Sequence, residues 1–228
     1  MQKRIWITRT LPSAHKSAAN FAHLGLASAI SPLLKIIPTL NMPSRPQDDD
    51  VLIFTSLNAL HWFCEFTKLR HWPVVTVGDE TAAQAQIAGF KDVSSASGTS
   101  KDVTQLVKSK FQAHQSIIHC SGNHVRGTII EDLQTAGYTA RRDEYYKSIP
   151  VTNLPKMDFS MLDYIALFSP LAAKTLANFK PDVATTTILS ISQATDTALG
   201  NIQCQSRLIA KAPNETAMLA LLGISQTV

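Results

Sequence analysis

Short apolar runs alternate with longer amphipathic segments along the 228-residue chain. Each run is short enough for a buried strand, and the segment that follows it has helical periodicity over about 8 to 14 residues. Strands alternating with helices in this way are typical of parallel sheets built from βα units. The pattern predicts about five strands in each half. In the first half they are Arg4–Thr8, Ala29–Pro32, Val51–Phe54, Val74–Val77 and Asp92–Ser94.

The second half of the chain repeats the pattern of the first. RIWITR (4–9) matches SIIHCS (116–121) at an offset of 112, and in both halves the helix that follows ends at a glycine, Gly25 or Gly137. The offset is 113 for the strands that end at Ser56 and Ser169, and it is 114 for VGDET and ISQAT. An offset that drifts by so little predicts an internal duplication.

Extended, proline-containing segments lie inside each repeat instead of between the repeats. They are PLLKIIP (32–38) and YYKSIP (145–150), and no comparable linker occurs at 108–115. The positions of these extended segments predict two similar parallel-sheet, flavodoxin-like α/β domains with swapped connectivity. The first domain would be discontinuous (1–36 and 150–228) and the second would be 42–144. A two-stranded β linker (36–42 and 144–150) would join them.

Hydroxyl-bearing residues follow the predicted strands, and ligands of open parallel sheets bind beyond the carboxyl ends of the strands. A single Ser or Thr at such a place most often only caps a helix. Several helix N-termini together supply free N–H groups and positive dipole ends, and arginines add charge-assisted hydrogen bonds. The set predicts a cleft for an anion with many carboxylates. Its members are Arg9, Thr55, Ser56, Thr81, Gly122, Asn123, Arg126, Ser169 and Thr195, with a helix expected to start near Ser121.

Composition and charge narrow the class of protein. Hydrophobic residues make up 45% of the chain, enough for a filled core, and no apolar run reaches the ~18 residues of a membrane helix. The net charge of +4 is spread out without Lys/Arg runs, so we expect no nucleic-acid partner. This charge suits a small anionic ligand, although many proteins without one carry as much. Three widely spaced cysteines and the lack of a secretory signal favour the cytoplasm.

No motif predicts a cofactor or a metal. GxGxxG, GxxxxGK[ST] and GxSxG are all missing from the sequence, so a nucleotide site and a nucleophile elbow lack support. His119, Cys120 and His124 look like metal ligands, but neighbouring residues of a strand point to opposite faces, which argues against a metal site. Tyr145 and Tyr146 lie where the second linker begins, and one of them is expected to face the cleft.

The order and spacing of these segments resemble the uroporphyrinogen-III synthase family over nearly the whole chain. No single motif is specific. The resemblance rests on ITR (7–9), IFTSLNA (53–59), VGDETA (77–82), Gly122-Asn123 with Arg126, Tyr146, FSP (168–170), ISQAT (191–195) and PNE (213–215).

The resemblance implies two α/β domains with swapped connectivity joined by a β-ladder, and a cofactor-free enzyme of tetrapyrrole (heme) synthesis. The substrate would be hydroxymethylbilane, a linear tetrapyrrole with eight carboxylates. The family removes its terminal hydroxyl and closes the ring, with inversion of the last pyrrole, through a spiro intermediate. Tyr146 matches the important tyrosine of the family and would act as a proton donor. We expect a monomer in transient contact with the preceding pathway enzyme.

The sequence departs from the family pattern at Thr10, Ser192 and Asp196. A carboxylate at Asp196 is unfavourable for an acidic substrate unless it points away, which puts the contact of Thr195 in question. Two alternatives stay open at this point. One is a non-enzymatic two-domain cleft protein that binds a small polyanionic ligand. The other is an interaction scaffold, against which the hydroxyl-rich strand ends argue.

Overall fold

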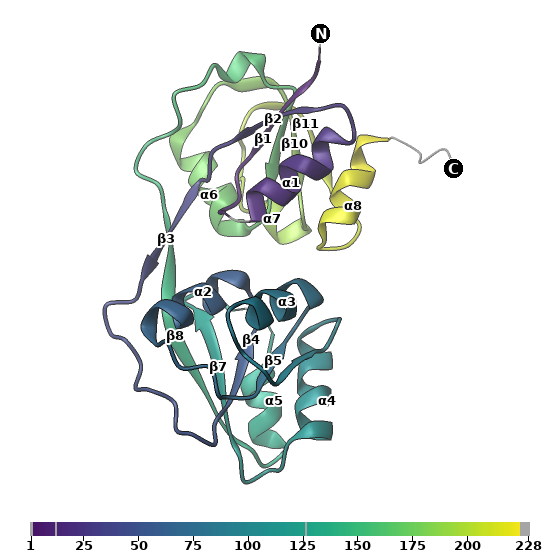
Figure 1. The fold of residues 1–228 in the computed structure, drawn as a ribbon. Helices are drawn as coiled ribbons and strands as arrows, with labels where there is room; N and C mark the ends of the chain where they lie inside the picture. The colour runs from purple at the N-terminus through teal and green to yellow at the C-terminus, as the bar shows by residue number, and fades with distance from the viewer. Residues whose placement is uncertain (1, 12, 126, 224–228) are drawn as a thin grey trace. The chain divides into compact units, whose positions relative to one another are not determined.

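The computed structural model describes residues 2–11, 13–125 and 127–223, and it consists of two compact units (Figure 1). The first unit contains the residues up to Lys35 together with those from Ile149 onward. The second unit is Ile36–Ser148. The chain therefore passes between the units twice.

The first unit is built around a five-stranded sheet in the order β11-β10-β9-β1-β2, and all of its pairs are parallel. Helices α1 and α8 pack on one face of the sheet, and α6 and α7 on the other. The strands are β1 (Arg4–Ile7), β2 (Ala27–Ile30), β9 (Tyr164–Leu167), β10 (Val183–Ser190) and β11 (Cys204–Ile209). The helices are α1 (Ser13–Ala22), α6 (Pro170–Phe179), α7 (Gln193–Thr197) and α8 (Glu215–Leu219), with 3-10 turns at Phe159–Met161 and Ala220–Leu222.

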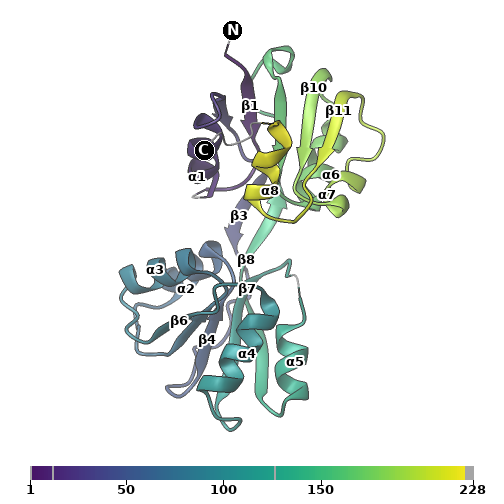
Figure 2. The ribbon, with the colours of Figure 1, turned by 90° about the vertical axis from the view of Figure 1, so that its right-hand side faces the viewer.

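The second sheet has six strands in the order β3-β8-β7-β4-β5-β6, and its strands β4 to β8 pair in parallel. Helices α2 and α3 lie together on one face, and α4 and α5 on the other (Figure 2). The strands are β3 (Leu34–Pro38), β4 (Val51–Phe54), β5 (Val74–Thr76), β6 (Val93–Ser95), β7 (Ser116–Gly122) and β8 (Thr139–Pro150). The helices are α2 (Leu57–Phe66), α3 (Asp79–Ile87), α4 (Ser100–Lys110) and α5 (Ile129–Thr135).

Five strands have the same spatial order in the two sheets. In the first sheet β1 has β2 on one side and β9, β10 and β11 on the other. In the second sheet β7 has β8 on one side and β4, β5 and β6 on the other. The matching segments RIWITR and SIIHCS supply the two central strands, β1 and β7.

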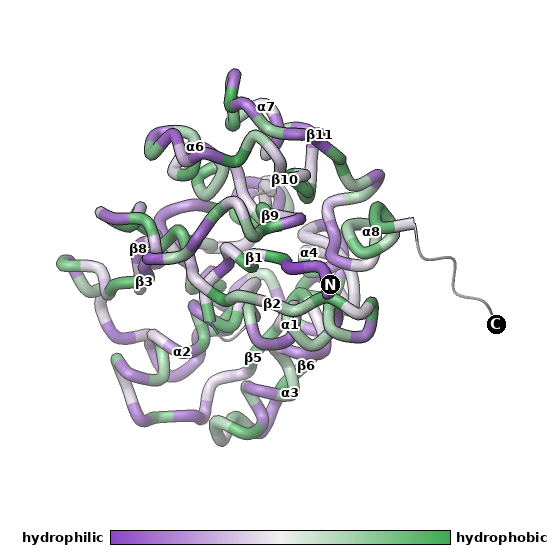
Figure 3. Tube along the Cα trace, turned by 90° about the horizontal axis from the view of Figure 1, so that it is seen from above, coloured by the Kyte–Doolittle hydropathy of each residue, from purple (hydrophilic) through white to green (hydrophobic). Residues whose placement is uncertain are grey.

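The strands are apolar on both faces because helices cover both faces of each sheet. All four residues of β4 are fully buried: Leu52 and Phe54 pack in the cluster under α2 and α3, whereas Val51 and Ile53 pack against α4 and α5. Hydrophobic and hydrophilic stretches accordingly alternate along the trace (Figure 3). The continuous run VLIF is thus a buried strand.

The predicted strands of the first half are all present, with ends that differ by up to two residues. The helix expected near Ser121 was wrong: strand β7 continues to Gly122, and the next helix begins at Ile129. The strand is longer because β8 continues to pair with it as far as Gly122 and Tyr146. Arg126, expected one turn into that helix, lies outside the described residues. Among the residues described, no helix has the length and apolar character needed to cross a membrane.

The variant Phe63→Ala tests how much the packing of Phe63 stabilises the core of the second unit. The buried ring of Phe63 has centroid distances of 5.4 Å to Phe54, 5.7 Å to Trp72 and 5.3 Å to Tyr145. We expect Phe63→Ala to lower the free energy of unfolding of this unit by about 3–5 kcal/mol. Denaturant titration followed by tryptophan fluorescence measures it. Leu40→Ala is the control, because Leu40 is 92% exposed. Equal shifts for both variants would contradict the packing.

Candidate active site

Three residues of the second unit meet beside the carboxyl ends of β4 and β7: Ser56, Gly122 and Tyr146. Ser56 follows β4, Gly122 ends β7, and Tyr146 is the register partner of Gly122 on β8. The Ser56 Oγ lies 3.2 Å from the Tyr146 Oη. We call these residues the Ser56–Gly122–Tyr146 cluster.

Ser56 is both a helix cap and a partner of the tyrosine. Its Oγ accepts a hydrogen bond from the Ala59 N–H at 3.1 Å, as the N-cap of α2. This bond uses one lone pair and leaves the hydroxyl proton free to donate to Tyr146. When Ser56 donates in this way, the phenol proton of Tyr146 is available to another acceptor.

Gly122 makes room for the tyrosine ring. A Cβ at this position would lie 2.4 Å from Cζ and 2.9 Å from Oη of Tyr146. The neighbouring Asn123 fixes β8 on either side of Lys147: its backbone N–H donates to the Tyr146 carbonyl at 3.0 Å, and its Oδ1 accepts from the Ser148 N–H at 2.9 Å. Asn123 therefore holds β8 in place through two hydrogen bonds, one from its backbone and one to its side chain.

The phenol of Tyr146 is protonated at neutral pH. Its side chain is 8% exposed, and burial raises the pKa of the phenol above its usual value of 10, with the Ser56 hydrogen bond opposing the shift. A buried hydroxyl that keeps its proton can donate a hydrogen bond or a proton to a leaving group.

Thr55 is joined to a histidine that the sequence offered only as a candidate metal ligand. Its Oγ1 lies 3.0 Å from Nε2 of His119, 64 positions away. Burial lowers the pKa of His119 to about 4, and the nearby Arg142 acts in the same direction. Among the described residues no cluster of metal-ligating groups occurs. No sequence signal linked this pair, since only the pairing of β4 with β7 brings it together.

Thr81 lies at the start of α3 and is 6% exposed. Two carboxylates, Asp79 and Glu80, precede it in the first turn of the helix. Hydrogen bonds from Ser95 and Ser97 lower the pKa of Asp79. These carboxylates already complement the positive end of the helix, so this end suits an anion less well than that of α2.

Ser169 in the first unit corresponds to Ser56. Its Oγ accepts from the Ala172 N–H at 3.2 Å as the N-cap of α6, and Pro170 is the first helical residue. Thr195 is fully buried, and its Oγ1 lies 3.0 Å from the Oγ of Ser192. Both hydroxyls thus stand at helix starts beyond strand ends, as the sequence predicted.

Arg9 forms an ion pair with Glu215 on α8 at 2.8 Å. The same carboxylate accepts hydrogen bonds from Ser17 at 2.9 Å and Asn20 at 2.8 Å. The Arg9 guanidinium also lies over the ring of Phe168, 4.5 Å from its centroid. A carboxylate of a ligand would therefore compete with Glu215 for Arg9, whose binding role stays a prediction.

The carboxylate of Asp196 is directed at Arg207 on β11. Their Oδ1 and Nε atoms are 2.8 Å apart, and Arg207 also donates to the carbonyls of Asp196 and Gly200. Ser192 takes over the capping of α7, because its Oγ accepts from the Thr195 N–H. The negative charge that put Thr195 in question is thus paired within its own unit.

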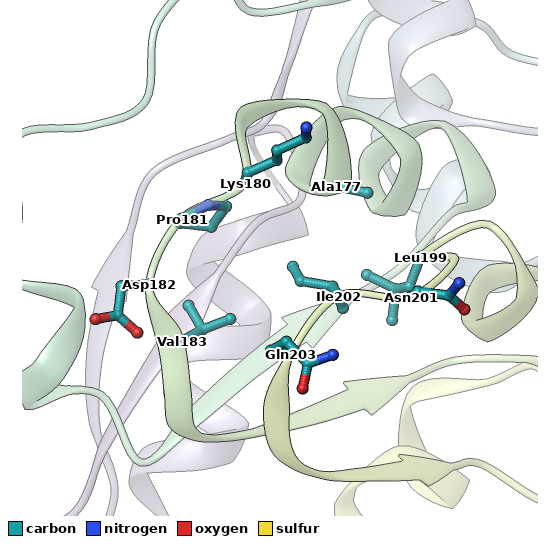
Figure 4. Close-up of a pocket in the computed structure, with 9 residues that line it drawn as sticks. All are labelled: Ala177, Lys180, Pro181, Asp182, Val183, Leu199, Asn201, Ile202 and Gln203. Atoms are coloured by element: carbon teal, nitrogen blue, oxygen red, sulfur yellow. The ribbon is translucent and has the colours of Figure 1, made fainter.

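A cavity of ≈ 530 Å³ opens elsewhere in the first unit (Figure 4). Its lining includes Val183, where β10 begins, and Gln203, which precedes β11. It therefore lies at the amino ends of these strands, at the edge opposite to Ser169 and Thr195, and does not contain the predicted site residues.

The fold and these strand ends define a two-unit α/β protein that presents hydroxyls and helix N-termini at the carboxyl ends of parallel sheets. A family model described as uroporphyrinogen-III synthase HemD matches residues 15–220. The chain therefore belongs to the uroporphyrinogen-III synthase family. It is an enzyme of porphyrin biosynthesis that cyclises hydroxymethylbilane to uroporphyrinogen III, with loss of water and inversion of ring D. The non-enzymatic alternative is not favoured.

Solved structures agree with the fold. The uroporphyrinogen-III synthetase of Helicobacter pylori is 18% identical, with a TM-score of 0.63 over 97% of this chain and 98% of that one. A mutant uroporphyrinogen III synthase of the extremely thermophilic bacterium Thermus thermophilus is 14% identical, with a TM-score of 0.50 over 97% and 96% of the two chains. Comparison with curated protein sequences gave no match.

Gly122→Ala tests the placement of Tyr146. The added Cβ forces the ring away from Ser56, so we expect kcat to fall about tenfold or more and stability to fall by about 1–3 kcal/mol. Steady-state kinetics and thermal unfolding measure the two effects. Gly78→Ala is the matched control, since its Cβ would meet no atom of the described residues within 4 Å. Wild-type kcat in Gly122→Ala would show that the ring position is not needed.

Proposed function

We propose that the Ser56–Gly122–Tyr146 cluster is where the hydroxyl group of hydroxymethylbilane departs, with Tyr146 as the proton donor. The observation that carries the proposal is the 3.2 Å contact between Tyr146 Oη and Ser56 Oγ, beside a glycine whose lack of a Cβ leaves room for the tyrosine ring. The raised pKa of the phenol supports it, because the proton stays on Tyr146 until a stronger acceptor arrives.

The elimination is balanced without a cofactor. The pyrrole nitrogen supplies an electron pair as the C–O bond of the hydroxymethyl group breaks, and the leaving hydroxide takes the proton of Tyr146 to form water. The resulting electrophilic methylene carbon is attacked by the terminal pyrrole on the way to the spiro intermediate. A proton released when the new ring system regains aromaticity restores the phenol. The protein then has to bind, fold and protonate its substrate.

The strand ends of both units hold the carboxylates of the substrate in this proposal. Hydroxyls and backbone N–H groups at helix starts donate to them. Thr55 and Ser169 are the best placed hydroxyls, because they are partly exposed. Ser56 gives its own proton to Tyr146 in this arrangement, so it serves a carboxylate only through the N-terminus of α2 that it caps. Thr195, Thr81 and Asn123 contribute chiefly by fixing the local backbone, since their side chains are buried or already engaged. Arg9 contributes if the substrate displaces Glu215.

The two units are, we infer, duplicated domains with swapped connectivity: 1–36 with 150–228, and 42–144. The common strand order β2-β1-β9-β10-β11 and β8-β7-β4-β5-β6 supports the duplication. The two passages of the chain between the units support the swap, with linker segments 36–42 and 144–150.

The enzyme is proposed to act as a monomer in the cytoplasm. All three cysteines are free thiols, which suits a reducing compartment. A transient contact with the preceding pathway enzyme would be useful, since hydroxymethylbilane left alone closes to the symmetric type I ring.

Tyr146→Phe tests the donor. We expect kcat to fall by about 10²–10⁴-fold, the usual contribution of a positioned acid, with KM little changed. The assay supplies fresh hydroxymethylbilane and separates the product isomers. Tyr145→Phe is the matched control: it is the adjacent tyrosine, and its buried Oη has no hydrogen-bond partner among the described residues, while burial and then the nearby Cys120 thiol raise its pKa. Unchanged turnover in Tyr146→Phe would reassign the ring to packing. Only the type I isomer from the wild type would overturn the enzymatic function.

Salt tests the role of the carboxylates. The Debye screening length shortens from about 10 Å at 0.1 M to about 3 Å at 1 M ionic strength. Salt therefore weakens the attraction between the protein and the substrate carboxylates, and we expect KM to rise with salt while kcat changes little. Steady-state kinetics from about 0.05 to 1 M KCl measure it, with unfolding followed over the same range as the control. A constant KM would argue against carboxylate-led binding.

A further inference from the structure

A buried histidine, His119, contacts Thr55 and takes no part in the proposed elimination. His119 is 1% exposed and sits on β7 as the register partner of Ile53 on β4. Thr55 is the first residue after β4, and its Oγ1 lies 3.0 Å from the imidazole Nε2. The histidine thus reaches a partly exposed hydroxyl at the strand end from inside the unit.

The imidazole is neutral at physiological pH. Burial is the main reason that its pKa is lowered to about 4. Two charged groups act on it from the neighbouring elements: Arg142 on β8 lowers the pKa further, and Glu131 on α5 raises it. A neutral imidazole has one N–H and one acceptor nitrogen, so its tautomer decides what Thr55 can do.

Only one tautomer lets Thr55 donate to an anion. When Nε2 carries the proton, it donates to Thr55 Oγ1, and the hydroxyl proton of Thr55 is free for another acceptor. When Nδ1 carries it, Nε2 accepts the threonine proton, and Thr55 offers only lone pairs. A carboxylate can only accept hydrogen bonds, and it is therefore held by the first arrangement and repelled by the second.

We propose that His119 is a positioning residue for substrate binding: it donates from Nε2 to Thr55 and turns the Thr55 hydroxyl proton toward a substrate carboxylate. This inference rests on the proposed role of the second-unit strand end as a substrate site. It assigns His119 to the recognition of anionic groups and leaves proton transfer to Tyr146.

A double-mutant cycle separates this role from packing. The variants are His119→Leu, Thr55→Val and the two combined, assayed for KM, kcat and unfolding. Each single change removes the donor, so we expect KM to rise about tenfold with kcat within about twofold of wild type. Because His119 acts through Thr55, the KM of the double variant should not exceed the KM of Thr55→Val. If instead the KM increase in the double variant equals the product of the two single increases, the inference is overturned.

Rescue by glutamine provides a second readout. The side-chain amide of His119→Gln replaces the donor at the Nε2 position, and KM should return to within about threefold of wild type. His114→Leu, at an exposed position, controls for the loss of a histidine. A folded Gln variant that binds as poorly as His119→Leu would overturn the proposal. Formation of the type III isomer by the wild type is checked first, so that a failure of the proposed function is recognised separately.

Discussion

Parallel strand pairing is the constraint on which the rest of this structure depends. Each described pair from β4 to β8, and each pair of the first sheet, is parallel, so a helix that joins successive strands within one unit must return over a face of the sheet. The returning helices bury both faces and make runs such as VLIF possible. They also place the carboxyl ends of β4 and β9 beside the N-termini of α2 and α6. Ser56 and Ser169 occupy equivalent corners for this reason.

The same burial determines the chemistry at that edge. Burial lowers the pKa of His119 to about 4 and raises the already high pKa of Tyr146, so both side chains are uncharged at neutral pH. Cations near the first-unit strand ends are paired, Arg9 with Glu215 and Arg207 with Asp196. The strand ends of each unit, taken by itself, therefore present oriented neutral donors, which can hydrogen-bond an anion without the cost of desolvating free cations. Such a surface suits a substrate that supplies its own electrophile.

The sequence predicted what depends on local pattern. The strand β4, the Ser169-Pro170 helix start and the strand-end hydroxyls follow from periodicity and capping rules. It could not predict features that arise from pairing between distant segments. The extension of β7 through Ser121 depends on β8, and the bond between Thr55 and His119 depends on the neighbourhood of β4 and β7. Likewise, the family resemblance pointed to Ser56 and to Tyr146 separately but did not predict that they are in contact. The sequence also did not predict the ion pair of Asp196 with Arg207.

The position of Tyr146 is set within the second unit alone. Although β8 continues to Pro150, Asn123 holds it at the Tyr146 carbonyl and at the Ser148 N–H, and the Thr39 N–H donates to the Tyr145 carbonyl at 3.1 Å. These bonds attach the tyrosine to the strand ends that also carry Ser56 and Gly122. If Tyr146 is the donor, its position for water loss is therefore fixed by hydrogen bonds within the second unit.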